Sequence, residues 1–151
     1  MDYTDELEKR TTPLGLLRYA QDYYRGFEII RIQKPKDTEM YQVKFFLLCH
    51  SMELVMKSLL KLKGYTRKQL MNNFGHDLEK ILKELEANKI IFDKKSYVVV
   101  SMANQLYKTK QFEYFQTGYK ELPAIEDLAS TAHLFITKMV YRLQNPGLYK
   151  D

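Results

Sequence analysis

Three polar side chains lie at helical spacing in the most apolar part of the chain. His50, Glu53 and Lys57 occupy positions i, i+3 and i+7, so a helix aligns them along one edge of its apolar stripe. One interpretation is a ligand pocket in which Lys57 binds a phosphate and His50 or Glu53 transfers a proton. The other is a structural Glu–Lys pair beside the core, with His50 hydrogen-bonded to a neighbour. We favour the structural interpretation, because such pairs are common beside cores.

His76 and Asp77 stand just before another predicted helix. Their side chains can cap the free N–H groups of its first turn. A helix N-terminus can also bind an anion, so both residues are candidates for ligand binding as well. The preference of Asp for the position before a helix favours capping.

Basic and aromatic side chains alternate in the segment that precedes the last predicted helix, and Lys110 and Tyr114 are the candidates there for ligand binding. Such a segment can stack bases and neutralise phosphates. It can equally pack a long loop onto the protein or form a dimer contact, where Tyr and Phe are enriched. Both possibilities remain open.

The remaining chemistry is sparse. His133 lies on the apolar face of the last predicted helix, where we expect a hydrogen-bonded core or interface residue. His50 and His133 are weak candidates for catalysis, and no catalytic role is assigned to either. Three dispersed histidines and one cysteine do not have the spacing of a zinc site. Neither a P-loop nor Gly-x-Gly-x-x-Gly occurs, so we expect no metal and no cofactor.

The elements that must position these residues are predicted to be helices. Caps, apolar stripes and breakers predict helices over 13–35, 37–64, 66–74, from 77 past 85, 92–107 and 123–144. The run Tyr97–Val100 favours a strand by propensity, but the spacing of the apolar residues that follow suits a helix. We therefore predict an all-α, up-and-down four-helix bundle with one short extra helix. Residues 1–11 are expected to be a mobile lead-in, 111–122 a loop and 146–151 a tail.

Composition agrees with one ordinary domain over residues 1–151. The net charge of +5 permits an acidic partner such as RNA or a nucleotide. Cys49 lies in an apolar run, which indicates packing and suits a reducing compartment. The acidic N-terminus is unlike an export signal, and no apolar run reaches the roughly 18 residues of a membrane span. We expect a cytoplasmic protein without a membrane partner.

Two segments, Phe45–Gly64 and Phe74–Leu85, resemble a HEPN domain (higher eukaryotes and prokaryotes nucleotide-binding domain). In that family a hydrophobic helix carries Glu and Lys four residues apart, followed by a glycine and then a Gly-His-Asp-Leu element that opens the next helix. The resemblance covers about 100 residues. The matching residues are Glu53, Lys57, Gly64, Gly75, His76, Asp77 and Leu78.

The resemblance implies a four-helix bundle, often dimeric, in a family that includes both RNases of defence and toxin–antitoxin systems and inactive binding modules. The active members carry an Arg four to six residues before a His, on or just before the final helix. Here Glu126, Asp127 and Leu128 occupy the positions where that Arg should precede His133. The nuclease pair is therefore missing from its expected place.

These observations predict a non-catalytic HEPN-like module that binds a nucleotide, RNA or protein partner as a homodimer. The alternative is a divergent metal-independent RNase, the toxin of a toxin–antitoxin or defence system, using His50 or His133 with Lys44, Lys57 or Arg142. A nucleotidyltransferase-like protein is the expected partner in that case. A third hypothesis is a purely structural interaction domain whose positive charge has no role.

Overall fold

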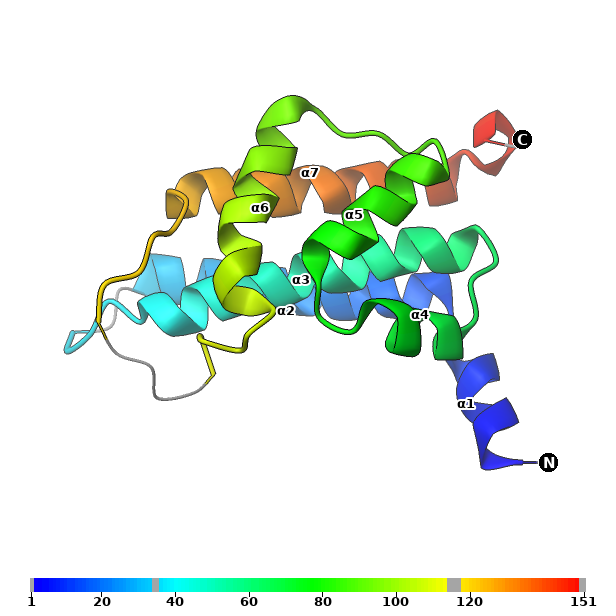
Figure 1. Cartoon of the computed structure of the whole chain (residues 1–151), viewed down its shortest axis with the longest axis horizontal. Coiled ribbons are helices and arrows are strands. Elements are labelled where there is room, and N and C mark those ends of the chain that lie inside the picture. The colour runs from blue at the N-terminus through cyan, green and yellow to red at the C-terminus, as the bar shows by residue number, and fades with distance from the viewer. Residues whose placement is uncertain (1, 34–35, 114–117, 150–151) are drawn as a thin grey trace.

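The protein is an all-α helical bundle (Figure 1). The structure, a computed structural model, describes residues 2–33, 36–113 and 118–149, and these contain no strand. None of their helices combines the length and the apolar character needed to span a membrane. The helices are α1 (Tyr3–Arg10), α2 (Pro13–Gln33), α3 (Tyr41–Leu62), α4 (Arg67–Phe74), α5 (Leu78–Ala87), α6 (Lys94–Tyr107) and α7 (Ile125–Gln144), followed by the 3₁₀ turn η1 (Pro146–Tyr149).

Helix α3 is the central element, and it contacts α2, α4, α5, α6 and α7. The long helices α2, α3 and α7 run side by side, with α2 antiparallel to the other two, while α5 and α6 lie obliquely against them (Figure 1). The predicted stripe of α3 is its buried face, since Phe45, Leu48, Met52, Val55 and Leu59 are at most 4% exposed. Burying this stripe provides much of the hydrophobic stabilisation of the bundle.

Two serines let α2 and α3 pack closely. The buried Ser51 and Ser58 lie seven residues apart on α3, so they face the same side of the helix. Ser51 Oγ donates to the carbonyl oxygen of Ala20 (2.7 Å), and Ser58 Oγ donates to that of Pro13 (2.6 Å). Both buried hydroxyls therefore have acceptors, and neither side chain holds the two backbones apart.

Most predicted helix starts are confirmed. Thr66 and Gln69 form a reciprocal capping box at α4. The segment that includes Tyr97–Val100 is helical: Asp93 caps α6, and Val99 and Val100 are buried. The intrinsic preference of the valines for strands is overridden because the apolar spacing buries one face of a helix against α5 and α7.

Two boundary predictions are wrong. The lead-in expected over residues 1–11 contains helix α1, which Asp2 caps and which has acidic residues in its first turn and basic residues in its last. Helix α3 begins at Tyr41 rather than after the Asp37–Thr38 pair, because Met40 adopts a left-handed conformation with φ 51°. Thr38 still accepts a hydrogen bond from Met40 N (3.1 Å), so its side chain supports the turn before the helix.

Candidate functional site

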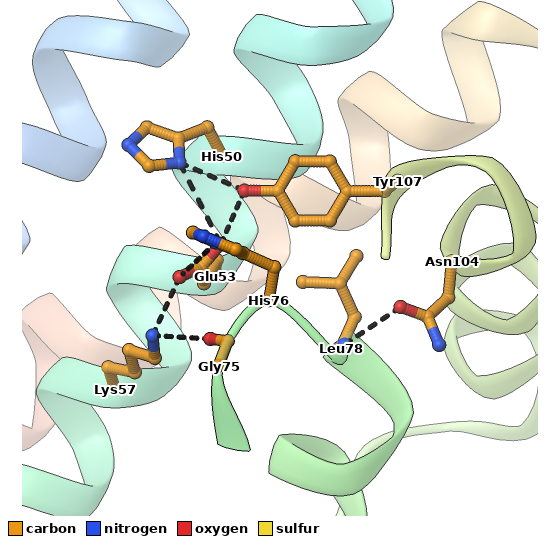
Figure 2. Close-up of polar contacts among 8 residues, drawn as sticks. All are labelled: His50, Glu53, Lys57, Gly75, His76, Leu78, Asn104 and Tyr107. Atoms are coloured by element: carbon orange, nitrogen blue, oxygen red, sulfur yellow. Dashed lines mark hydrogen bonds and ion pairs between the residues drawn. The ribbon is translucent and has the colours of Figure 1, made fainter. Parts of the chain in front are cut away.

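Glu53 lies at the centre of a buried polar network between α3, α5 and α6 (Figure 2). Its carboxylate accepts a hydrogen bond from Lys57 Nζ (2.6 Å) and one from the Tyr107 hydroxyl. His76 Nδ1 lies 3.0 Å from Oε2 and 3.2 Å from Oε1 of the same carboxylate. We call His50, Glu53, Lys57, His76 and Tyr107 the Glu53 cluster. Glu53 itself is only 2% exposed, so it belongs to the core rather than to its edge.

The local sequence explains how Lys57 and His76 reach Glu53. Lys57 follows Glu53 by one helical turn, the spacing at which two side chains of a helix meet. Gly75 ends α4 with φ 52°, a conformation that residues with a side chain rarely adopt, and it turns the chain so that His76 faces α3. The carbonyl oxygen of Gly75 accepts a second hydrogen bond from Lys57 Nζ (2.7 Å). Lys57 thus fastens the α4–α5 turn to α3.

His50 joins the cluster through Tyr107. Its Nδ1 lies 2.9 Å from the Tyr107 hydroxyl oxygen and 3.8 Å from Glu53 Oε2. The imidazole stacks on Phe46, with ring centres 5.4 Å apart, and meets the edge of Tyr23 at 4.4 Å. These aromatic contacts fix the ring plane, so only its outer edge is left toward the surface.

The charges of the cluster follow from its contacts. Burial opposes the ionisation of Glu53, but the close contacts with His50 and Tyr107 and the hydrogen bond and charge of Lys57 hold its pKa well below the usual range. Burial first, and then the Glu53 charge, raise the pKa of the Tyr107 phenol far above its ordinary value. Near neutral pH Glu53 is therefore a carboxylate and Tyr107 a neutral phenol.

The hydrogen bonds also assign the protons on the two imidazoles. A carboxylate only accepts, so the nitrogen of His76 that faces Glu53 must carry a proton. The single hydroxyl proton of Tyr107 makes the hydrogen bond to Glu53, so the hydroxyl oxygen accepts a hydrogen bond from His50 Nδ1–H. Both histidines therefore keep Nδ1–H toward the core. Each neutral ring leaves the lone pair of Nε2 on its outer edge.

His76 and Asp77, the second pair of predicted site residues, have different roles. Asp77 caps α5 by accepting from Lys80 N (3.2 Å), as the favoured interpretation predicts. Asn104 of α6 completes this cap: its Oδ1 accepts from Leu78 N (2.8 Å), and its Nδ2 donates to Asp77 Oδ1 (2.9 Å). Two of the N–H groups that an anion would need, those of Leu78 and Lys80, are thus bound by side chains, and His76 is the exposed member of the pair.

The other predicted site residues lie elsewhere. His133 is exposed on α7 and packs on Tyr24 at 5.8 Å between ring centres, so the expectation of a core position is wrong. Ala132 and Phe135 lie on the buried face of α7, whereas His133 lies on the side of the helix that faces solvent. Lys110 follows α6 with a left-handed φ of 58°. Its backbone N–H donates to Tyr107 O, and its carbonyl oxygen accepts from Glu113 N. Tyr114 lies outside the described residues.

Two members of the network were missed from the sequence. Tyr107 and Asn104 both lie on the apolar face of α6, and both are at most 2% exposed. A fully buried amide requires hydrogen-bond partners. The presence of Asn104 among apolar residues of the helix could therefore have predicted a buried polar contact. Nothing in the sequence paired Tyr107 with Glu53, which lies 54 residues away.

No protein-family model, curated protein or solved structure is significantly similar to this chain. The resemblance to HEPN domains therefore remains a hypothesis based on the two motif segments. Within the described residues no group of three or more His, Cys, Asp or Glu side chains is arranged to hold a metal ion. The polar chemistry of the Glu53 cluster is that of a carboxylate and an ammonium that neutralise each other, with two imidazoles at the outer side.

Proposed function

We propose that this chain is a HEPN-like module that binds the phosphate of a nucleotide or RNA, without catalysis and as a homodimer. The observation that carries the proposal is that the residues of the two motif segments meet in one network. Glu53 and Lys57 come from the first segment, Gly75 and His76 from the second, and direct hydrogen bonds join all four. This gives each of these four residues a structural role, and the outer edges of the histidines remain for a ligand.

The proposed ligand is anionic because the outer edge of the cluster consists of imidazoles within a basic protein. The side chain of His76 is 48% exposed and that of His50 is 21% exposed, whereas Lys57 is 12% exposed and already paired with Glu53. An imidazolium Nε2–H is a charge-assisted donor to phosphate oxygen. The net charge of +5 favours the approach of such a ligand.

The absence of catalysis is supported by where the candidate groups lie. A metal-independent RNase needs a cation at the phosphate together with a histidine that moves the proton of the 2′-hydroxyl. Lys57 is bound to Glu53, and His133 makes its ring contact with Tyr24. Arg142 is buried beside Leu62 at the C-terminal end of α3, about three helical turns beyond His50. Of these cations, Lys57 is the one shown beside the histidines of the cluster, and its ammonium is bound to Glu53 and to the carbonyl oxygen of Gly75.

Ligand binding is tested by thermal unfolding with AMP, GTP and a short oligouridylate, because a ligand of the folded state raises the melting temperature with its concentration. We expect stabilisation of the wild type, a weaker effect for His76→Asn, and an unchanged effect for the matched control His133→Asn. Equal stabilisation of all three proteins would place the ligand elsewhere. No stabilisation by any of these ligands would favour a structural interaction domain.

The non-catalytic part is tested by incubating labelled RNA with the wild type and with His50→Ala, His76→Ala and His133→Ala. We expect no cleavage by any of the four. Cleavage by the wild type that one of these substitutions abolishes would instead identify a divergent RNase. Sedimentation of the wild type tests the homodimer, and a monomer at all concentrations would contradict it.

A further inference from the structure

The two imidazoles of the Glu53 cluster are oriented in the same sense. The Nδ1 atoms of His50 and His76 lie 3.8 and 3.0 Å from the same oxygen of Glu53. In an imidazole the two nitrogens face opposite ways, so each Nε2 faces away from the carboxylate, and Figure 2 shows this for His50. The described residues provide no hydrogen-bond partner for either Nε2. Both Nε2 nitrogens therefore have fixed tautomers and face away from Glu53.

The other groups around the imidazoles keep their charge near neutral pH. Glu53 and Lys57 neutralise each other, and Tyr107 stays protonated. Burial raises the pKa of the Cys49 thiol, so it stays neutral as well. The remaining neighbours on the packed elements are Tyr23 of α2, Asp77 and Lys80 of α5, and Lys108 and Glu113 of α6 and the turn after it.

None of these neighbours ordinarily titrates near pH 7, whereas histidine does. The pKa of Asp77 lies even further below neutral pH than that of an ordinary aspartate. Burial opposes its ionisation, but the Asn104 hydrogen bond and nearby lysines hold its pKa below the usual value. The imidazole side chains are therefore the groups of the cluster at which we look for a protonation change on ligand binding.

We infer that the ligand is a phosphate monoester whose binding takes up protons at Nε2 of His50 and His76. This inference rests on the proposed function and identifies its ligand chemistry. A dianion beside the outer edges stabilises the imidazolium forms, and each proton gained turns a lone pair into a donor to the phosphate. Glu53 supports the same change, because the hydrogen bond that its carboxylate accepts from His76 Nδ1–H becomes stronger when the ring is an imidazolium.

A monoester suits this arrangement better than an internal phosphodiester. A terminal phosphate carries close to two negative charges above pH 7, whereas a diester carries one. Two imidazolium donors would balance the charge of a terminal phosphate. With a diester they would leave one positive charge in excess. Terminal phosphates occur both on free nucleotides and on phosphorylated RNA ends, and these two sources share the chemistry inferred here.

Isothermal titration with AMP above pH 7 measures this coupling, because the phosphate is then already dianionic. Repeating the titration in two buffers of different ionisation enthalpy gives the number of protons taken up per ligand bound. We expect net uptake, with affinity that falls by up to about tenfold per pH unit for each coupled proton. Binding of AMP without proton uptake would overturn the inference and leave the proposed function standing.

Asparagine substitutions test the role of Nε2 on the outer edge of each imidazole. The amide nitrogen of asparagine stands at the same chain position as Nδ1 of histidine, so His76→Asn and His50→Asn keep a donor toward the core and remove Nε2. We expect each variant to fold, to bind AMP more weakly and to take up fewer protons, while His133→Asn matches the wild type. Uptake unchanged in both variants would contradict the inference.

The source of the phosphate is resolved by an oligouridylate with and without a 5′-phosphate. Stronger binding of the phosphorylated RNA supports recognition of an RNA end, and binding of AMP alone supports a free nucleotide. Equal binding of both RNAs would overturn the monoester assignment in favour of internal phosphodiesters. Failure of AMP and of both RNAs to bind would overturn the proposed function together with this inference.

Discussion

His76 Nδ1 lies 3.0 Å from Glu53 Oε2, and this contact joins the turn before α5 to the centre of α3. It unites two segments that are separated by α4 in the chain. The same carboxylate accepts from Lys57 and Tyr107, so one buried charge organises side chains from three elements. The packing of these elements and the orientation of His76 therefore depend on Glu53.

Replacing that residue provides the first prediction. Glu53→Gln keeps the shape of the side chain but leaves the Lys57 ammonium without its counter-charge. Breaking a buried ion pair in this way typically costs about 3 kcal/mol or more, so we expect a loss of that size in the free energy of unfolding. Urea denaturation measures it. The double variant Glu53→Gln/Lys57→Met should recover part of the loss, and a single variant as stable as the wild type would contradict a structural role.

The lowered pKa of Glu53 predicts acid sensitivity. In the unfolded chain a glutamate titrates near its ordinary pKa of about 4.3, whereas in the folded protein burial is outweighed by the contacts with His50 and Lys57. The unfolded state then binds more protons between the two pKa values, so the stability from Glu53 is present above about pH 4.3 and is lost as the pH falls below it. Urea denaturation between pH 5 and 3 should show a steeper loss for the wild type than for Glu53→Gln. Parallel curves would refute this assignment.

Asn104 provides a test of the cap that α6 supplies to α5. In Asn104→Leu the buried N–H of Leu78 loses its acceptor, which costs about 2 kcal/mol because a buried donor is left unsatisfied. The matched control Gln105→Leu changes an exposed residue of the same helix and should alter stability by less than about 0.5 kcal/mol. Thermal unfolding compares the two variants. Equal effects would show that the Asn104 contact does not stabilise α5.

Glu8 ties helix α1 to the rest of the bundle. The helix buries no side chain, and Glu8 connects it to Lys61 and to the backbone N–H of Arg67 (2.7 Å). Because the pair is partly exposed, Glu8→Gln should change global stability by less than about 1 kcal/mol. Hydrogen exchange should nevertheless become faster across residues 3–10, while Glu6→Gln, at the more exposed pair with Arg10, should have less effect. Unchanged protection in Glu8→Gln would mean that other contacts hold α1.

The fold was predictable because its determinants are local. Apolar spacing marks the buried face of α3, and the Thr66–Gln69 capping box marks the start of α4. Helix α1 was missed because its anchor, Glu8, pairs with residues more than 50 positions away. The start of α3 was misplaced because Met40 adopts a left-handed conformation that its residue type does not favour.

The site was only half predictable for a related reason. His50, Glu53 and Lys57 share a helix edge, so spacing alone brought them together. The contributions of His76 and Tyr107 depend on how α5 and α6 pack on α3, which no local pattern encodes. His133 was placed in the core because its neighbours are apolar, although the helix turns its side chain toward solvent.

The most direct test of phosphate binding at the Glu53 cluster is nuclear magnetic resonance of protein labelled only at histidine. The chain has three histidines, so three sets of ring signals report on the two cluster residues and on His133 as an internal reference. On titration with AMP we predict that the Nε2 signals of His50 and His76 move toward those of imidazolium while the His133 signals stay in place. Shifts confined to His133, or no shift at saturating AMP, would contradict the account.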